Sequence, residues 1–316
     1  MLRLIISGFV SFILVVLIMP KYINLLKKID YNQRVSEYSL DEFKNKAKTP
    51  TMGGVLFVLV TVLITLILNF QLLNYSILMF LLVFIGYALI GFLDDYIIIV
   101  KNNNEGLLPQ YKLLLQVLIA IIFFILFQNH ANTTVSIFNF NLDLKYFYGL
   151  FGLIMFTGEA NAVNFTDGMD GLATGVFIIA IIPYLVYAYH IKAYGIAVLI
   201  ASLIGALIGY LKFNRHPARV FMGDAGSLAL GAGIAVIAML LKVELSILII
   251  GGVFLWEMLC VIIQQIAVRV FHKRVFLYTP IHYAFVKKGY PEQKVVTGFY
   301  WLQIGCSILG MIILWS

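Results

Sequence analysis

The stretch SILMFLLVFIGYALIGFLDDYIII, residues 76–99, decides the fold of this chain. Its only charged residues are Asp94 and Asp95, and it is long enough to cross the hydrocarbon core of a bilayer, which takes a helix of about 20 apolar residues. The rest of the chain has the same character: of 316 residues, 62% are hydrophobic and 12% are charged. A soluble domain could not bury that much apolar surface, so the sequence indicates an integral membrane protein.

Apolar stretches that could span a bilayer as helices of roughly 17 to 25 residues recur along the chain. They cover residues 2–24, 53–70, 76–99, 111–128, 145–163, 172–190, 193–211, 225–241, 245–271 and 296–315. The first has a single cation at its start, Arg3, and no small-residue cleavage site after it, so we expect a retained helix rather than a signal peptide. Alternation of apolar and polar residues from Thr133 to Leu142 predicts a short β-hairpin on the outer surface. We therefore expect an all-α polytopic membrane protein with about ten transmembrane helices, formed by one domain over residues 1–316.

Cations are distributed unevenly between the two sides of the expected bundle. A chain that crosses a bilayer changes side at each span, so the loops after odd-numbered spans share one face. All but four of the 22 Lys and Arg residues fall on that face, the exceptions being Arg3, Lys145, Lys192 and Lys242. The positive-inside rule places this face in the cytoplasm and both termini outside. The cations are spread over short loops without a nucleic-acid-binding motif, so we expect contact with anionic lipid and no nucleic-acid partner.

Asp94 and Asp95 belong to this cytoplasmic face. They close the third span, where two adjacent carboxylates would repel each other and face the negative end of the helix dipole. A hard cation bound by oxygen ligands would offset that repulsion. The alternative is a solvated helix end that binds no ligand.

A second polar run follows the fifth span, where Asn161, Asn164, Asp167 and Asp170 recur at every third residue. On a helix this spacing forms one polar stripe, which is costly near lipid unless it meets ligands. A purely structural helix cap would need one such group, so the run favours a binding site.

Asp224 begins the eighth span in the segment Phe221-Met-Gly-Asp-Ala-Gly-Ser227. One interpretation is an N-cap for that helix. Another adds a metal or phosphate at the same place, because glycines free the backbone amides and a helix N-terminus favours anions. The two roles are compatible. Phe221 is either a membrane-interface aromatic or a ring on which a base stacks.

Three acidic loops on one face, with cations nearby, are what a diphosphate substrate requires. Carboxylates hold Mg²⁺, the metal neutralises developing charge, and Lys or Arg binds the remaining oxygens. The residues therefore favour phosphoryl transfer at the cytoplasmic membrane surface. A secondary transporter is the alternative from another class, but transporter carboxylates lie near the bilayer midplane in broken helices, whereas these acids lie at span ends.

The motifs of this chain resemble those of the MraY family, the phospho-N-acetylmuramoyl-pentapeptide transferases of peptidoglycan synthesis. The matching segments are Pro50–Gly54, Gly91–Tyr96, Asn161–Gly175, Asn214 with Pro217, Phe221–Ser227 and Thr279–His282, in the same order and over most of the chain. The resemblance implies a Mg²⁺-dependent enzyme of the bacterial inner membrane. In its reaction undecaprenyl phosphate attacks the β-phosphate of UDP-MurNAc-pentapeptide, giving lipid I and UMP. Family precedent also implies a homodimer.

The resemblance further implies roles for individual residues. Asp224 matches the principal Mg²⁺ ligand, and Asp94 matches the residue that deprotonates the lipid phosphate, with Asp95 beside it. Asp170 and Phe221 match positions that hydrogen-bond and stack the uracil. The other expected substrate-binding residues are Lys46, Thr51, Asn164, Asp167, Asn214, Gly223 and Ser227, which match positions around the nucleoside, phosphate or sugar, and Lys112, which matches a further family lysine. The lipid tail is expected in an apolar groove that reaches from the ninth span, which contains Glu257 and Gln264.

One loop departs from the family pattern. Where the family has Pro-x-His-His-His-Phe-Glu, this chain has Pro280-Ile-His-Tyr-Ala-Phe-Val286, so His282 alone remains as a candidate catalytic histidine. Tyr283 and Ala284 stand at the other two positions. A sister branch, the GlcNAc-1-phosphate transferases that begin teichoic-acid or O-antigen chains, shares the acidic motifs and has a different loop here. Transfer from UDP-GlcNAc is therefore the alternative activity.

Overall fold

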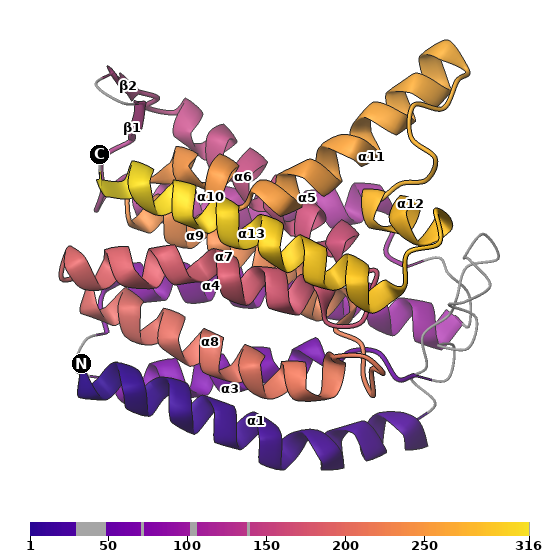
Figure 1. Ribbon diagram of the computed structural model, residues 1–316. Helices are drawn as coiled ribbons and strands as arrows, with labels where there is room; N and C mark the ends of the chain where they lie inside the picture. The colour runs from indigo at the N-terminus through magenta and orange to yellow at the C-terminus, as the bar shows by residue number, and fades with distance from the viewer. Residues whose placement is uncertain (30–48, 71–72, 102–105, 138–139, 316) are drawn as a thin grey trace.

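The computed structural model describes residues 1–29, 49–70, 73–101, 106–137 and 140–315. It is a bundle of long helices with a two-stranded hairpin at one end (Figure 1). The helices are α1 (Leu2–Lys28), α3 (Gly54–Leu68), α4 (Tyr75–Lys101), α5 (Pro109–Phe127), α6 (Phe147–Thr166), α7 (Leu172–His190), α8 (Tyr194–Asn214), α9 (Gly223–Leu240), α10 (Ile247–Ile250), α11 (Gly252–Phe271), α12 (Ile281–Lys287) and α13 (Glu292–Trp315), with a short 3₁₀ helix η2 (Glu244–Ser246).

Eight of these helices are long and apolar enough to cross a membrane, which confirms the polytopic all-α architecture. They are α1, α4, α5, α7, α8, α9, α11 and α13. The other two expected spans are also helical. α3 has 15 residues, and α6 has 20 residues with the polar residues of the Asn-Asp run at its end.

α9 lies at the centre of the bundle and packs most extensively against α4 and α6. Every residue from Ala225 to Met239 is buried. Glycine and alanine make up much of this helix, and small side chains let neighbouring helices approach closely, as is typical of helix packing in membranes. The helix that carries Asp224 in its first turn is therefore held by neighbours along almost its whole length.

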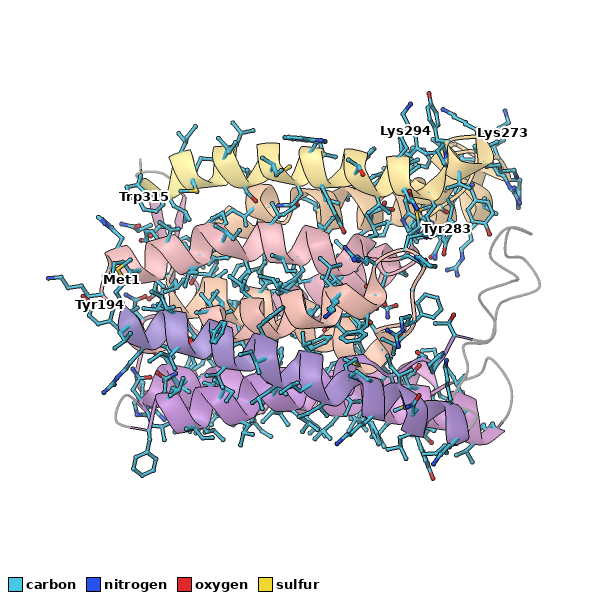
Figure 2. All side chains as sticks on the ribbon, turned by 60° about the horizontal axis from the view of Figure 1, so that its bottom comes forward. Met1, Tyr194, Lys273, Tyr283, Lys294 and Trp315 are labelled. Carbon is cyan, nitrogen blue, oxygen red and sulfur yellow. The ribbon has the colours of Figure 1, made fainter. Side chains whose placement is uncertain are left out.

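The two ends of the bundle differ in what they carry. Figure 2 shows Met1, Tyr194 and Trp315 at one end, and Lys273, Tyr283 and Lys294 at the other. Both chain termini thus lie at the same end. The predicted hairpin is present at that end, with β1 (Thr134–Ile137) antiparallel to β2 (Phe140–Asp143) and Val135 paired with Leu142 (Figure 1).

The expected ninth span, residues 245–271, is not one continuous helix. It is divided into η2, α10 and α11, with Gly251 between the last two, and α11 leans away from the other helices (Figure 1). Gly251 and Gly252 lie at the break. Glycine has a more flexible backbone than other residues and weakens a helix, so kinks are common at such pairs. An uninterrupted apolar run cannot reveal such a break, because hydropathy does not change there.

Candidate active site

The acidic motifs meet at the end of the bundle opposite to the termini. Asp224 stands at the start of α9, and its side chain is 23% exposed. Its Oδ1 accepts a hydrogen bond from Asn164 Nδ2 on α6 at 2.7 Å, and its Oδ2 accepts one from Lys112 Nζ on α5 at 2.9 Å. The same Asn164 nitrogen donates to Ser227 Oγ at 2.8 Å, one turn further along α9. Four residues expected to bind substrate or metal are thereby brought into direct contact.

Asp94 lies on the other side of Lys112. The Lys112 ammonium is 3.7 Å from Asp94 Oδ1, so one cation lies between the carboxylates of Asp94 and Asp224. The backbone amide of Leu107 donates to the same Asp94 oxygen at 3.1 Å. Asp94 is 8% exposed, and its charge is balanced by Lys112 rather than by bulk water.

Asp95 has a different environment from its neighbour. Its Oδ1 accepts the backbone N–H of Asp224, and its Oδ2 accepts the backbone N–H of Ala225, both at 3.1 Å. These are two of the amides that a helix leaves without intrahelical partners at its N-terminus. Asp95 on α4 therefore caps α9 from a neighbouring helix.

Two expectations about these acids are wrong. Asp224 is not the N-cap of its helix, since Met222 holds that position without a side-chain cap, and Asp95 supplies the missing acceptors. Nor do Asp94 and Asp95 close a helix, because α4 continues to Lys101. The helix-dipole repulsion inferred for a C-terminal pair does not apply, and tertiary contacts determine what each acid does.

Gly91 allows this arrangement. A Cβ at Gly91 would overlap the backbone carbonyl of Asp224, so α4 and α9 approach each other more closely than any other residue would permit. Gly223, with φ of +74°, has Asp95 Oδ2 and Thr51 Oγ1 close to the place where a side chain would begin. Thr51 and Gly223, both expected at the substrate site, thus lie beside the capped start of α9.

The Asn-Asp run does not form one helical stripe as expected. α6 ends at Thr166, Asp167 is its C-cap, and Asn161 donates back to the carbonyl of Thr157 within the helix. Asp167 still belongs to the acidic cluster: burial raises its pKa well above the usual range, and the carboxylates of Asp224 and Asp170 raise it further. The carboxyl groups of Asp167, Asp170 and Asp224 therefore lie close enough to affect one another's ionisation.

Asp170 lies in the turn between α6 and α7 and is 4% exposed. Its Oδ2 accepts hydrogen bonds from the backbone N–H of Ala218 and from His216 Nδ1, both at 3.0 Å. Its own backbone N–H donates to Glu292 Oε1 at 2.8 Å. Asp170, His216 and Glu292 are close enough to share a cation, but the contacts among them already hold three segments together. Sequence reasoning did not name His216 or Glu292 as site residues. Two signals were available: His216 lies next to the Asn214 and Pro217 motif, and Glu292 lies in a segment, residues 288–296, that resembles the family's sequence.

Phe221 is half-buried in the segment before α9. Its backbone N–H donates to the carbonyl of Pro50, and its carbonyl accepts from Gly53, both at 2.8 Å. Two motifs far apart in sequence, Pro50–Gly54 and Phe221–Ser227, are thus joined by main-chain hydrogen bonds. Lys46, also expected at the substrate site, lies outside the described residues.

Asn214 is buried at the end of α8. Its Nδ2 donates to the carbonyl of Val220 at 3.1 Å, and its Oδ1 accepts from the Thr174 hydroxyl at 2.9 Å. Both ends of the amide are used inside the protein, so the observed contacts of Asn214 hold the loop that precedes Phe221.

His282 is fully buried on α12, where its Nδ1 is 3.1 Å from Glu257 Oε1. Next to it, the Tyr283 hydroxyl donates to the carbonyl of Gly168 at 2.8 Å, and burial raises the tyrosine's pKa. The altered histidine loop is therefore attached to the turn that carries Asp167 and Asp170.

An apolar pocket lies between α11, α12 and α13. Its volume is about 320 Å³, and its lining consists of Trp256, Phe285, Tyr290, Lys294, Val295, Gly298, Phe299 and Leu302. A single cation, Lys294, interrupts an otherwise apolar or aromatic lining, which suits a hydrocarbon chain with an anionic end.

The arrangement combines clustered carboxylates, one bound ammonium and a capped helix N-terminus. Carboxylate oxygens suit a hard divalent cation, and the ammonium suits phosphate oxygens. Such a site can bind a metal–diphosphate complex and stabilise charge as it moves between phosphate oxygens.

Comparison with known proteins agrees with this chemistry. Residues 77–242 match the model of glycosyl transferase family 4, and residues 46–58 match the phospho-N-acetylmuramoyl-pentapeptide-transferase signature 1. The chain is 43% identical over 315 residues to the phospho-N-acetylmuramoyl-pentapeptide-transferase of Staphylococcus saprophyticus, with 97% of each chain covered. It is 40% identical over 308 residues to the transferase of the same name from a Geobacillus strain, covering 96% of this chain and 95% of the relative. By motif, length and identity, the chain belongs to the phospho-N-acetylmuramoyl-pentapeptide-transferase family.

Proposed function

We propose that this protein transfers phospho-MurNAc-pentapeptide from UDP-MurNAc-pentapeptide to undecaprenyl phosphate, forming lipid I and releasing UMP in peptidoglycan synthesis. The observation that carries the proposal is the Lys112 ammonium lying between Asp94 and Asp224 at the start of α9. A metal–diphosphate complex needs carboxylates to hold the metal and a cation to hold phosphate oxygens, and these three residues provide both. Family membership supports the identity of the donor and the acceptor.

Asp224 would hold Mg²⁺, with Asp94 beside it. The fit follows from the donor set: both residues offer carboxylate oxygens, and a single cationic group already contacts both. When bound, Mg²⁺ neutralises charge on the diphosphate. Lys112 would then be available to hold a phosphate oxygen within the same cluster.

The bond-forming step requires one proton acceptor and little covalent chemistry. Asp94 takes the proton of the lipid phosphate, whose oxygen attacks the β-phosphorus. The bond from that phosphorus to the bridging oxygen breaks, and the bridging oxygen leaves with UMP. We favour this direct route over a phosphorylated aspartate, because a phosphate oxyanion is already a nucleophile and needs mainly positioning and charge neutralisation.

Other residues position the substrates. Asp95 acts on the start of α9, since both of its oxygens bind backbone amides there. Phe221 would stack the uracil and Asp170 would bind its edge. The apolar pocket between α11, α12 and α13 would take the part of the polyprenyl chain nearest its phosphate, with Lys294 at the charged end.

The position of the site in the membrane is part of the same proposal. The cation-rich end of the bundle would face the cytoplasm of a bacterial cell, where UDP-linked substrates are made, and both termini would lie outside. The active form would be a homodimer, as in the family. Maleimide labelling of single cysteines placed after Trp315 tests the orientation, and the mass of the detergent-solubilised protein tests the dimer.

The activity is tested with purified protein, undecaprenyl phosphate and Mg²⁺, offering UDP-MurNAc-pentapeptide and UDP-GlcNAc separately. We expect UMP release and a lipid-linked product with the first donor and neither with the second. Efficient transfer from UDP-GlcNAc would reject the proposed donor and favour the sister branch. No UMP release with either donor would reject transferase activity altogether.

A further inference from the structure

His282 belongs to a buried pair of ionisable side chains that the proposed reaction does not yet use. Its Nδ1 is 3.1 Å from Glu257 Oε1, and both side chains are 0% exposed. The second oxygen of Glu257 accepts the backbone N–H of Ile281 at 2.8 Å. One carboxylate on α11 therefore holds both the start of α12 and the imidazole that follows it.

The hydrogen-bond inventory determines where the imidazole proton lies. An ionised carboxylate can only accept hydrogen bonds, and Oε2 already accepts one from Ile281. A buried carboxylate is costly unless its oxygens receive such donors, which makes Nδ1–H of His282 the matching partner for Oε1. In the neutral ring the proton then lies on Nδ1, and Nε2 carries a lone pair.

Nε2 faces the acidic turn between α6 and α7. It is buried and has no hydrogen-bond partner among the described residues. A Cβ at Gly168 would overlap Nε2, so the ring lies directly against the backbone between Asp167 and Asp170. Tyr283, labelled in Figure 2, fixes the same contact through its hydroxyl, which donates to the Gly168 carbonyl at 2.8 Å. A buried acceptor that has no donor among the described residues leaves room for a donor from a bound ligand.

We propose that Glu257 is a positioning residue for the transfer reaction: it keeps the His282 proton on Nδ1, so that Nε2 accepts a hydrogen bond from the bound sugar–peptide donor substrate. A phosphate oxygen is itself an acceptor and would be repelled by this lone pair. The matching groups are the hydroxyl and amide N–H groups of the donor substrate, and not its diphosphate. The substrate part of this inference rests on the proposed function.

The substitution that tests it is Glu257→Gln, which keeps the shape of the side chain. Glutamine has one acceptor oxygen, which the Ile281 N–H requires, so its amino group would face His282 Nδ1. The imidazole must then accept a hydrogen bond at Nδ1 and carry its proton on Nε2. Nε2 would thereby change from a hydrogen-bond acceptor to a donor. Nitrogen-15 NMR of the histidine rings reports this directly, and the chain has only 5 histidines, which makes assignment by substitution practical.

We expect Glu257→Gln to lower kcat/KM for UDP-MurNAc-pentapeptide at least tenfold, while the affinity for UMP stays within twofold of the wild-type value. His282→Ala should lower kcat/KM to a similar extent. In a double-mutant cycle, Glu257→Gln should have little further effect once His282 is alanine, because Glu257 acts through that ring. The matched control is Glu159→Gln, which makes the same change at a buried glutamate whose Oε2 has no partner among the described residues, and it should keep normal turnover.

Three outcomes would overturn the proposal. One is a wild-type spectrum in which Nε2, rather than Nδ1, of His282 carries the proton. This measurement uses the wild-type protein and so does not depend on whether a variant folds. Another is additivity of the two substitutions, which would assign Glu257 a structural role through Ile281 alone. The third is unchanged kcat/KM in Glu257→Gln. Failure of the proposed function would look different, because the wild-type protein itself would then not use UDP-MurNAc-pentapeptide.

Discussion

The capping of α9 by Asp95 leads to a prediction that distinguishes the role of Asp95 from that of its neighbour Asp94. Asp95 gives one carboxylate oxygen to the amide of Asp224 and the other to that of Ala225. Asn at this position keeps one acceptor and turns an amino group toward the second amide, which is buried. A hydrogen bond to a charged group contributes about 1.5–3 kcal/mol, and an unsatisfied buried amide costs about 1–3 kcal/mol. Asp95→Asn should therefore lower the free energy of unfolding by about 2 kcal/mol and displace Asp224 enough to reduce turnover.

Asp94→Asn is the matched comparison. Asp94 Oδ1 accepts the Leu107 amide and lies 3.7 Å from the Lys112 ammonium, and an asparagine carbonyl can take the same place. We expect it to lose turnover with little change in stability, because it removes the proposed base but not a cap.

The assay has two measurements. One is UMP release, and the other is the temperature at which each detergent-solubilised variant loses its monodisperse peak in size-exclusion chromatography after heating at one fixed rate. Asp95→Asn should lower that temperature clearly and Asp94→Asn should not. If Asp95→Asn unfolds at the wild-type temperature while its turnover falls, the cap is energetically unimportant and Asp95 acts on substrate instead.

Three further predictions concern the same end of the bundle. Asp224→Asn should abolish nearly all turnover while the protein remains folded, since α9 is capped by Asp95 and not by Asp224; retained UMP release would remove Asp224 as the metal ligand. Phe221→Ala should weaken binding of uridine nucleotides by about 1–3 kcal/mol in a titration, the usual loss of base stacking on an aromatic ring, whereas unchanged affinity would place the base elsewhere. Gly91→Ala should destabilise the protein by about 1–3 kcal/mol, because its methyl group would meet the Asp224 carbonyl, and a normal unfolding temperature would show that α4 can move away.

The sequence was sufficient for features that depend on composition and spacing. Long apolar runs predicted the helices, and the alternation from Thr133 to Leu142 predicted the hairpin. The acidic loops after odd-numbered spans were expected on one face. Lys112 contacts both Asp94 and Asp224, and Asn164 contacts Asp224, so these loops do meet at one end of the bundle. Each of these features follows from the periodicity of a segment or from the alternation of sides.

What the sequence could not supply were contacts made across the fold. Asp95 and Asp224 are 129 residues apart, so a local pattern suggested that Asp224 capped its own helix, whereas the cap comes from α4. The break at Gly251 leaves hydropathy unchanged, and the end of α6 at Thr166 depends on the turn that follows. Glu292 accepts the backbone N–H of Asp170, 122 residues away in sequence, and no local pattern predicts that contact.

The burial of α9 has a consequence for how this enzyme tolerates change. From Ala225 to Met239 every position is enclosed, and most possible replacements would be larger than the residue present. Substitutions in this helix should therefore lower the yield of folded protein rather than the turnover of the protein that folds. The segment that carries Asp224 cannot unfold locally without disrupting the packing of the whole bundle. Its backbone amides should be among the last to exchange with deuterium, at a rate set by global opening. Variants with altered substrate or inhibitor response should accordingly arise in the surrounding loops and only rarely on α9.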